Sequence, residues 1–405
     1  MTVPGFRTYW AAATIGAFGS SVTVIAIQVL VVSVLDASAT EVGLIRAVQL
    51  LPYLLLGLVV GALVDRMRRK PVLVWSNVLL AATLLVIPAL WALDRLSLWA
   101  VAVVLFLFGT LNVIEFAALQ SFLPRLVPRS ELLAANARLD QSETVAQTTG
   151  PVVGGGLVSL LGAPWAVLVD AVSYLVSAVL IARVPIDEPP PRPTTTRLRQ
   201  EIIEGVRWIY LHKTLAPLAW STHVWFLGNS MAATVLVPFA LRSLGLSPLT
   251  YGIALALAGV GGLLGALLAT RLGHSYGAGR IVLLGRLLTM AAWAVVALAP
   301  AASAGVTLSS SFFAIAAGQL TLGLGMGVEN ANEMGYWQAN TPDEVQGRVN
   351  ATRRSANRTI AVAGAVVGGL LADLVGFRPT LWLAVAVFAV ASAILALSPF
   401  RSARH

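Results

Sequence analysis

Three glutamates stand inside long apolar stretches, where a carboxylate is placed to bind and release a proton. Glu115 lies in LNVIEFAAL, and Glu329 and Glu333 lie four residues apart in GMGVENANEMG. A charged group inside a bilayer costs at least about 2.5–3.5 kcal/mol on insertion scales, and a like-charged neighbour adds to that cost. Protonation removes the charge, so these residues are candidates for proton coupling, the pair Glu329 and Glu333 ahead of Glu115.

A second interpretation is that the same glutamates are charges at a cytoplasmic gate. Basic residues follow them in the sequence, and Arg348, Arg353 or Arg354 would then be their ion-pair partners. The two roles can coexist.

The segments that hold these glutamates are repeated. Residues 109–157 align with residues 323–371 at a constant offset of 214, and 12 of the 49 aligned positions are identical. Glu115 aligns with Glu329, and GPVVGGGL in the first copy aligns with GAVVGGLL in the second. A repeat of about half the chain with a matched carboxylate in apolar sequence predicts a two-fold membrane transporter.

The composition excludes a soluble protein. Hydrophobic residues make up 58% and charged residues 11% of the 405 residues, against roughly 45–50% and about 25% in globular proteins. The mean hydropathy is +0.83. There is no cysteine, which excludes disulfides, thiol catalysis and thiolate metal sites. The four histidines do not cluster, and no nucleophile elbow or phosphate-binding loop is present, so we expect no enzyme, cofactor or metal.

The distribution of the net charge of +9 predicts a membrane topology. Most of the 27 Lys and Arg residues lie at alternate ends of the apolar runs, among them Arg280, Arg286 and the basic clusters at 66–70 and 348–358. By the positive-inside rule those ends and both termini face the cytoplasm, and the number of spans is even. The expected partner of this charge is the lipid bilayer; nucleic acid is not expected.

Twelve apolar runs are long enough to cross a bilayer, which takes about 20 residues. Breaks at Gly, Pro and charge clusters place them near residues 8–35, 41–64, 72–93, 98–123, 132–161, 165–184, 215–242, 249–272, 280–300, 306–337, 344–375 and 379–398. The predicted fold class is all-α integral membrane, with twelve transmembrane helices in two pseudo-symmetric six-helix bundles. The bundles are expected at residues 1–184 and 214–405, with a cytoplasmic linker at 185–213.

The linker is expected to have two parts. The segment PIDEPPPRPTTTRLR carries enough Pro and charge to remain unpacked. In LRQEIIEGVRWIYLHK at 198–213, Leu198, Ile202, Val206 and Ile209 share one helical stripe. This pattern predicts an amphipathic helix, which either lies on the cytoplasmic membrane face or packs on the ends of the spans.

The loop after the second span reads GALVDRMRRKPVL. It resembles the signature of the major facilitator superfamily at this place, G-x-x-x-D-R-x-x-R-K. Arg68 stands where that family usually has glycine, which puts the tight turn in doubt. The resemblance extends over the whole chain through the twelve spans, the linker and the repeat, and it implies a secondary transporter. The matching residues are Gly61, Asp65, Arg66, Arg69 and Lys70.

The carboxylate of this motif occurs once, because Ala269 stands in its place in the second half. In the superfamily the loop packs against span 11 when the cytoplasmic side is closed. TPDE at the start of span 11 predicts Thr341 as the N-cap, Pro342 as the first helical residue and a capping-box glutamate. We therefore expect Asp65 to latch the closed state by facing this positive helix start or Arg348. The alternative is that the loop only anchors the topology.

Span 5 contains AQTTGPVVGG, which resembles a motif of proton-coupled drug exporters, G-x-x-x-G-P-x-x-G-G. Gly150, Gly154 and Gly155 leave space for close helix approach, and Pro151 can kink the span. Span 11 has Ala365 in place of the proline, an asymmetry that favours export. Plain glycine packing is the alternative. LPRLVP and EGVRW are similar to the bacterial drug and siderophore exporter branch but indicate no substrate.

In this superfamily spans 1, 4, 7 and 10 line a central cavity, so side chains at three- and four-residue spacing on these spans are candidates for substrate contact. Mostly apolar stripes with a few polar groups suit a small amphipathic organic compound. A histidine on such a stripe either carries a proton or makes one neutral hydrogen bond. The candidates are Phe18, Ser21, Gln28, Phe108, Asn112, His223, Phe226, Asn229, Gln319 and Met326.

Spans 5 and 11 begin with opposite charges, and Asp140 aligns with Arg354. These charges either form a cytoplasmic gate between the halves or reach the membrane surface independently. The gate candidates are Asp140, Glu143, Arg348, Arg353, Arg354 and Arg358.

These features predict a secondary active transporter in the bacterial cytoplasmic (inner) membrane, acting as a monomer. It would export a drug, secondary metabolite or siderophore by proton antiport, with a role in efflux and antibiotic resistance. One alternative is a symporter or uniporter that imports a small solute on the same fold. Another is an integral-membrane enzyme or lipid-handling protein.

Overall fold

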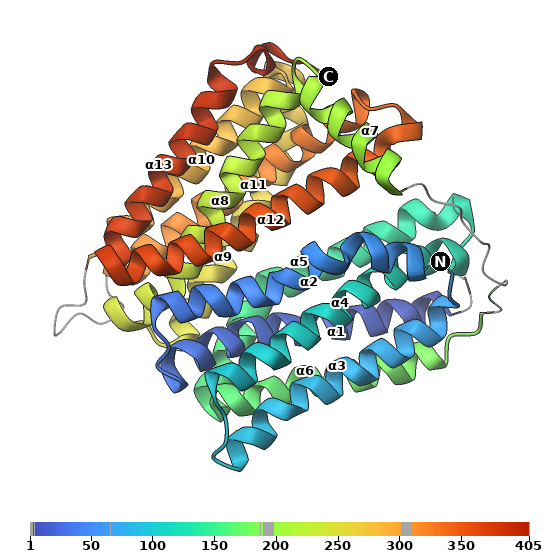
Figure 1. Ribbon diagram of the computed structural model, residues 1–405, viewed down its shortest axis with the longest axis vertical. Coiled ribbons are helices and arrows are strands. Elements are labelled where there is room, and N and C mark those ends of the chain that lie inside the picture. The colour runs from blue at the N-terminus through green and yellow to red at the C-terminus, as the bar shows by residue number, and fades with distance from the viewer. Residues whose placement is uncertain are drawn as a thin grey trace. The chain divides into compact units, whose positions relative to one another are not determined.

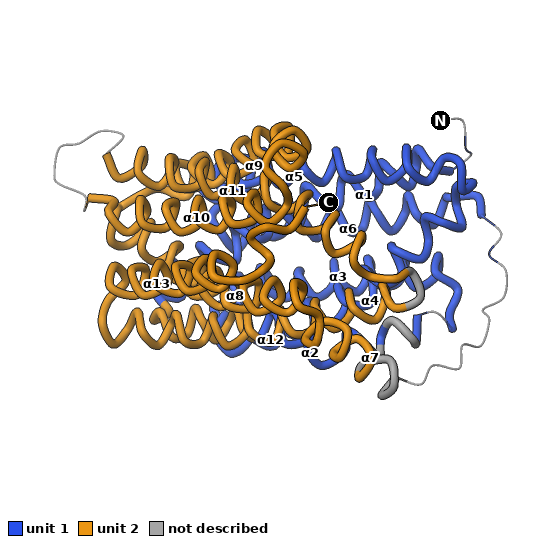
Figure 2. The backbone as a smooth tube through the Cα atoms, turned by 90° about the horizontal axis from the view of Figure 1, so that it is seen from above, with its two compact units in different colours: residues 1–36, 48–196 blue, residues 37–47, 197–405 orange. Residues whose placement is uncertain are grey.

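The computed structural model describes residues 3, 5–64, 66–186, 188, 198–300 and 310–404 (Figure 1). These ranges are helical apart from short connections and contain no β-strand, so the predicted all-α membrane class is confirmed. The chain divides into two compact units. Unit 1 is residues 1–36 with 48–196, and unit 2 is residues 37–47 with 197–405 (Figure 2).

The helices follow the predicted spans closely. Unit 1 contains α1 Phe6–Val29 with a π-helical end Leu30–Val34, most of α2 Ala39–Val64, α3 Arg69–Ala92, α4 Leu98–Leu126, a 3₁₀ turn Arg129–Glu131, α5 Leu132–Leu161 and α6 Ala163–Ala182. Unit 2 contains α7 Leu198–Leu211, α8 Leu215–Pro238 with a π-helical end Phe239–Ser243, α9 Pro248–Tyr276, α10 Ala278–Ala297, α11 Ser310–Ala339, α12 Asp343–Val375, α13 Phe377–Ala396 and a 3₁₀ turn Pro399–Ser402.

The repeat extends to the helix boundaries. The helices α1 and α8, α2 and α9, and α3 and α10 start 209 residues apart, and the two π-helical ends have the same spacing. The helices α6 and α13 start 214 residues apart, which is the offset of the sequence repeat. The first three helices of each half therefore correspond at an offset of 209 residues, and the later helices correspond at 214. At 209 the position of Asp65 corresponds to His274, whereas the sequence motif pairs it with Ala269; neither residue is a carboxylate.

Eleven helices of the described chain are long and apolar enough to cross a membrane. The predicted span that is missing from these eleven is α5, because its first 18 residues contain many polar and charged side chains. Such groups are costly to place against lipid, so this part of α5 is expected to contact water or other polar groups. The exposed polar residues are Asn136, Arg138, Asp140, Gln141, Glu143, Thr144, Gln147 and Thr149.

The glycines of the span 5 motif bring α5 against α1. A Cβ built on Gly150 would lie 2.3 Å from the Cβ of Ser21, and one on Gly154 would lie 3.1 Å from the Cα of Val22. In unit 2 the aligned Gly364 would meet the Cβ of Ser230 at 3.0 Å. Close helix approach therefore explains these glycines in both halves, whereas Pro151 has no counterpart in α12.

Gly150→Ala is expected to lower the melting temperature of the detergent-purified protein, because the added methyl group overlaps Ser21. Overpacking of this kind typically costs about 1–3 kcal/mol. The double variant Gly150→Ala/Ser21→Gly removes the overlapping atoms and is expected to regain most of the stability. Wild-type melting of the single variant would contradict the close α1–α5 contact.

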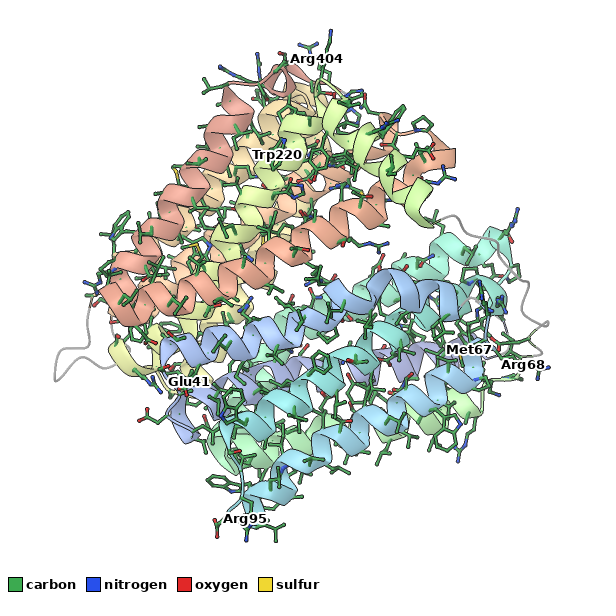
Figure 3. All side chains as sticks on the ribbon, viewed as in Figure 1. Glu41, Met67, Arg68, Arg95, Trp220 and Arg404 are labelled. Carbon is green, nitrogen blue, oxygen red and sulfur yellow. The ribbon has the colours of Figure 1, made fainter. Side chains whose placement is uncertain are left out.

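The loop between α2 and α3 forms without a glycine-dependent turn. Arg68 has φ −72° and ψ 127°, an extended conformation that any residue adopts, so the doubt raised by this departure from the family signature is removed. Met67 and Arg68 lie at one end of unit 1, and Arg95 lies at the opposite end (Figure 3). The exposed Arg66 and Arg68 keep the predicted basic loop at the surface.

Two residues of the loop motif lie outside what the structure describes. Asp65 is not among the described residues, and for Gly61 only the backbone, inside α2, is described. The latch therefore stays a prediction. Arg69 is 4% exposed and donates from Nη1 to the carbonyl of Met67 at 2.7 Å.

Part of the linker is packed, in contrast to the expectation. The Glu188 carboxylate accepts from the backbone N–H of Lys70 at 3.2 and 3.3 Å, and Lys70 Nζ donates to the carbonyl of Val184 at 2.8 Å. Ile186 packs against the apolar core of unit 1. An anion near a helix N-terminus is stabilised by the free N–H groups there. Proline content predicts a free segment and gives no signal for such a contact.

Helix α12 begins one residue later than predicted. Pro342 is the N-cap residue, with φ −57°, ψ 145° and no side-chain capping hydrogen bond. Within the described structure Thr341 Oγ1 is buried without a hydrogen-bond partner. The predicted Thr341 cap is therefore wrong, because the extended Pro342 separates the hydroxyl from the helix start. The side chain of Glu344 lies outside the described structure.

Helix α7 combines the two placements expected for an amphipathic linker helix. Gly205 and Ile209 are buried on the side that packs against α12 and α8. Ile203, Val206 and Leu211 are exposed, Leu211 by 79%. The predicted stripe put Val206 and Ile209 on one face, and the structure separates them because close packing centres on Gly205. The side chains of residues 198–202 lie outside the described structure.

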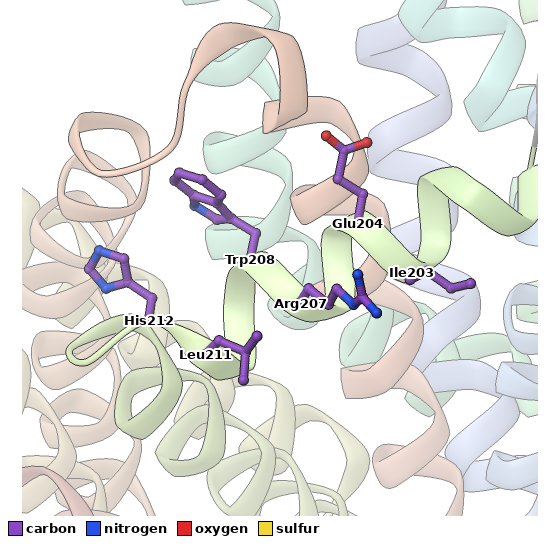
Figure 4. A pocket seen from close by; sticks show the side chains of 6 residues that line it. All are labelled: Ile203, Glu204, Arg207, Trp208, Leu211 and His212. Carbon is purple, nitrogen blue, oxygen red and sulfur yellow. The ribbon is translucent and has the colours of Figure 1, made fainter.

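The outer side of α7 carries a shallow groove (Figure 4). Ile203, Arg207 and Leu211 lie along one side of the helix, and Trp208 and His212 lie along another (Figure 4). Helix α7 ends at Leu211, and the membrane span α8 begins four residues later at Leu215. Apolar and basic side chains together suit a helix that lies so close to the start of a span.

Candidate functional site

Two arginines and two glutamates form a buried ion cluster inside unit 2. Arg286 of α10 donates from Nη1 to Glu329 Oε1 at 3.0 Å and from Nη2 to Glu333 Oε2 at 2.9 Å. Arg353 of α12 donates to Glu333 Oε1 at 3.0 Å. Arg286 is 1% exposed and Glu329 is 3% exposed. The four formal charges cancel, so each buried carboxylate of α11 has a cationic partner.

A hydroxyl and two indole rings surround the cluster. Arg286 Nη2 also donates to Thr222 Oγ1 of α8 at 2.9 Å. The guanidinium of Arg286 lies 5.5 Å from the ring centroid of Trp225, and that of Arg353 lies 4.0 Å from that of Trp337. Cation–π contacts strengthen when they are desolvated, as here. The cluster therefore joins α8, α10, α11 and α12.

The charge pattern predicts Arg286 at a cytoplasmic end of a span, and the structure instead places it inside the helix bundle. It lies eight residues after the start of α10, on the side that faces α11. A cation close to Arg280 looks like a topology signal, which is why sequence reasoning missed its role. The available signal is the pair Glu329 and Glu333, which needs a buried cation because both carboxylates lie inside the bundle.

The aligned carboxylate of unit 1, Glu115, has a neutral partner. Asn77 Nδ2 of α3 donates to Glu115 Oε1 at 2.9 Å and to the carbonyl of Leu73 at 2.8 Å. Asn77 is 1% exposed, so this amide is fixed inside the unit. No Lys or Arg of the described chain forms an ion pair with Glu115.

Asn77 and Arg286 occupy equivalent positions of the repeat. Each lies eight residues after the start of its helix, α3 or α10. Each donates to one of the two aligned glutamates, Glu115 and Glu329. The same helix–helix contact therefore holds an amide and a carboxylate in unit 1 but a guanidinium and a carboxylate in unit 2. Only the second arrangement balances the carboxylate charge.

A second carboxylate of unit 1, Asp170 of α6, is 0% exposed, whereas Glu115 is half-buried. Ser173 Oγ donates to Asp170 Oδ1 at 3.0 Å. Gly19 of α1 makes room for this oxygen, because a Cβ there would lie 2.5 Å from it. No ion pair to Asp170 occurs among the described residues. Glu115 and Asp170 of unit 1 therefore have no ion-pair partner among the described residues, whereas Glu329 and Glu333 of unit 2 each have one.

His223 of α8 is hydrogen-bonded at both ring nitrogens. Nδ1 lies 2.7 Å from Asn357 Oδ1 of α12, and Nε2 lies 2.6 Å from the Tyr210 hydroxyl of α7. With Oδ1 as the acceptor, Nδ1 carries the proton and Nε2 of a neutral ring accepts from Tyr210. Burial raises the pKa of Tyr210, which keeps its hydroxyl a donor. The geometry favours the hydrogen-bonding interpretation of His223 and ties the linker helix to α8 and α12.

The predicted substrate-contact residues fall into two groups. Phe108, His223 and Gln319 are at most 7% exposed, so these three lie inside their own units. Ser21 packs against Gly150 but is half-buried, like the second group. A helical stripe in a sequence cannot distinguish the face that packs within a bundle from the face that lines a cavity. The other half-buried candidates are Phe18, Gln28, Asn112, Phe226, Asn229 and Met326.

Two predicted gate arginines have partners within unit 2. Arg348 forms an ion pair with Glu204 of α7, and Arg353 forms the ion pair with Glu333 described above. The latter pair matches the gate interpretation of Glu333 more closely than the proton-coupling one. The other candidates are exposed on their own units, and the gate stays a prediction for them: Asp140, Glu143, Arg354 and Arg358.

The described residues contain no group of three His, Asp or Glu side chains placed to hold a metal ion. The polar chemistry of the site is that of carboxylates, amides and guanidinium groups.

Comparisons with known proteins agree with this architecture. Residues 1–405 match the transmembrane secretion effector family. The chain is 27% identical over 380 residues to the enterobactin exporter EntS of Escherichia coli, which covers 91% of this chain and 86% of that protein. It is also 27% identical over 324 residues to EntS of Shigella dysenteriae, covering 78% and 73% of the two chains.

Solved structures show the same fold at low identity. The nucleoside transporter NupG superposes with a TM-score of 0.78 at 10% identity and covers 97% of this chain. A bacterial homologue of the iron transporter ferroportin superposes with a TM-score of 0.73 at 15% identity, also over 97%. The helix repeat, the buried carboxylates and the match over the full length lead to one conclusion: the chain belongs to the transmembrane secretion effector family of the major facilitator superfamily of secondary transporters.

Proposed function

We propose that this protein is a proton-coupled exporter of a small amphipathic organic compound and works by alternating access as a monomer. On the predicted topology it lies in the bacterial inner membrane with both termini in the cytoplasm. The similarity to enterobactin exporters supports export of a siderophore-like or drug-like compound. Pro151 supports the same direction, because the proline of the exporter-type motif occurs in α5 and is replaced by Ala365 in α12, although Ala146 stands in place of the first glycine of that motif.

The observation that carries the proton coupling is the difference between Glu115 and Glu329. Glu115 can gain or lose a proton without breaking an ion pair, because Asn77 is its partner. Glu329 cannot, because protonation would leave Arg286 less well compensated inside unit 2. We therefore place the coupling proton on Glu115 in preference to the pair Glu329 and Glu333.

Asn77 suits a site that changes protonation state. Its amide nitrogen donates to the carboxylate, and its amide oxygen can accept from the carboxylic acid. In an export cycle a proton enters from outside, neutralises Glu115 and leaves to the cytoplasm when the site reopens.

In this proposal the cluster of Arg286, Glu329, Glu333 and Arg353 is a fixed structural element. It holds four helices of unit 2 together by hydrogen-bonded ion pairs. Unit 2 then keeps its shape through the cycle while the protonation of unit 1 changes.

A two-step experiment tests the function. A drug and siderophore panel in a pump-deficient host would first identify a compound whose toxicity falls when the protein is made. In everted membrane vesicles that compound is then expected to accumulate only with an acidic interior, and an uncoupler is expected to abolish the accumulation. Accumulation that is indifferent to the uncoupler would overturn proton coupling, and transport in the opposite direction would overturn export.

A further inference from the structure

The geometry points to a substrate-recognition pocket between α1 and α5 of unit 1 that takes a planar aromatic ring with an anionic group. This inference rests on the proposed export function and names the chemical class of the exported compound. The pocket has a volume of about 320 Å³ and is lined by Trp10, Thr14 and Phe18 of α1 and by Arg138, Gln141, Ser142 and Val145 of α5. Its volume lies near the lower end of small-molecule sites, roughly 300–1,000 Å³, and fits one substituted ring.

Trp10 provides a fixed aromatic wall. Its indole Nε1 donates to Ser142 Oγ at 2.8 Å and lies 3.3 Å from the carbonyl of Arg138, so α5 holds the ring in one orientation. Trp10 remains 37% exposed. Phe18 lies two helical turns further on the same stripe of α1 and is half-buried. Two aromatic side chains on one face favour a flat, π-rich ligand.

Arg138 provides the charge selectivity. Its side chain is exposed towards the pocket rim, and no carboxylate of the described chain forms an ion pair with it. Asp140 lies two positions further along α5, so it points to a different side of the helix. A guanidinium group with free donors binds a carboxylate or phenolate through two parallel hydrogen bonds. The pocket therefore discriminates in favour of an anion.

Two side chains can recognise a substituent beside the anionic group. Ser142 Oγ accepts from Trp10 and still has its own hydroxyl proton to donate. Gln141 is exposed and carries both an amide donor and an amide acceptor. A ring hydroxyl next to the acidic group would satisfy both.

The position of the pocket fits uptake of substrate from the cytoplasm. On α5 it is lined by Arg138, Gln141 and Ser142, polar side chains that are costly to place against lipid. Trp10 is the fifth residue of α1, and on the proposed topology this end of the helix is cytoplasmic. An exporter takes up its substrate from that side.

Equilibrium binding of radiolabelled salicylate to the purified full-length protein tests the assignment. Salicylate carries a ring, a carboxylate and an adjacent hydroxyl. Benzyl alcohol, which lacks the charge, and cyclohexanecarboxylate, which lacks the aromatic ring, are the competitors. Saturable salicylate binding is expected, and each competitor is expected to bind at least tenfold more weakly. Equal competition by either one would overturn the ligand class.

Variants locate the site. Arg138→Gln is expected to weaken salicylate binding at least tenfold while leaving benzyl alcohol binding unchanged. Arg138→Lys keeps the charge but replaces the bidentate fork with a point charge, so it is expected to bind salicylate more weakly than wild type and more tightly than Arg138→Gln. Trp10→Leu is expected to weaken both ligands. Arg129→Gln, an exposed cation of unit 1 outside the pocket, is the control and is expected to bind as wild type does.

The outcomes separate this inference from the proposed function. Salicylate binding requires no proton gradient and is therefore measured independently of transport. If salicylate does not bind, or if Arg138→Gln and Trp10→Leu both bind it as wild type does, the pocket assignment is wrong even when vesicles show proton-driven export. Binding that depends on Arg138 in a protein without proton-driven export leaves the pocket standing and overturns the transport mechanism.

Discussion

Arg286→Met is expected to destabilise the protein more than any other single change in unit 2. The substitution leaves Glu329 Oε1 and Glu333 Oε2 without the guanidinium that both now contact at 3.0 and 2.9 Å. Breaking a buried ion pair by removal of one partner costs about 3–5 kcal/mol. The expected result is a large loss of monodisperse protein and a lower melting temperature in detergent, measured by fluorescence-detected size-exclusion chromatography.

Two further variants separate the buried cluster from a general charge effect. Arg280→Met removes an exposed cation from the same helix and is expected to melt as wild type does. Adding Glu329→Gln to Arg286→Met removes one uncompensated carboxylate and is expected to recover part of the loss. An Arg286→Met protein as stable as Arg280→Met would show that the cluster does not hold unit 2 together.

Asn77→Arg is expected to abolish proton coupling while preserving the fold. The substitution gives unit 1 the partner that unit 2 has at the equivalent position, so Glu115 becomes the anion of an ion pair. A charge-assisted hydrogen bond stabilises the carboxylate over the acid. Proton-driven accumulation of substrate in everted vesicles is therefore expected to fall at least tenfold, to the level of a Glu115→Gln variant.

The matched control for that variant is Asn77→Gln, which keeps a neutral amide at the same position. Coupled transport is expected to continue in Asn77→Gln, because the amide can still pair with either protonation state of Glu115. Equal loss in Asn77→Arg and Asn77→Gln would indicate a packing defect at a residue that is 1% exposed. Full coupling in a folded Asn77→Arg protein would rule out Glu115 as the proton carrier.

Much of the fold follows from local rules that a sequence displays. Apolar length, basic loops and the offset of 214 predict the twelve helices, because lipid demands long apolar helices and marks their ends with charge. The departures occur at helix ends. Glu188 accepts from the start of α3, a contact between segments that are distant in the sequence. Helix α12 begins at Asp343, because the extended Pro342 separates the Thr341 hydroxyl from the helix start.

The candidate site was only half predictable for the same reason. The depth of Glu115 and Glu329 follows from the repeat, but their partners come from helices that are distant in the sequence. Arg286 is a cation close to Arg280 in the sequence, as expected of a topology signal, and Asn77 is an ordinary polar residue in an apolar run. Only the packing of α3 on α4 and of α10 on α11 shows that the two residues are counterparts.

Proton movement by reconstituted protein tests the central claim most directly. Glu115→Gln and Glu329→Gln proteins, matched for the amount of folded transporter, would be placed in liposomes that contain a pH-sensitive dye, with the exported compound added on one side. Glu115→Gln is expected to show no substrate-driven proton flux, and Glu329→Gln is expected to keep it. Proton flux that survives in Glu115→Gln and is lost in Glu329→Gln would contradict the assignment to Glu115 and would place the coupling proton on Glu329 of α11.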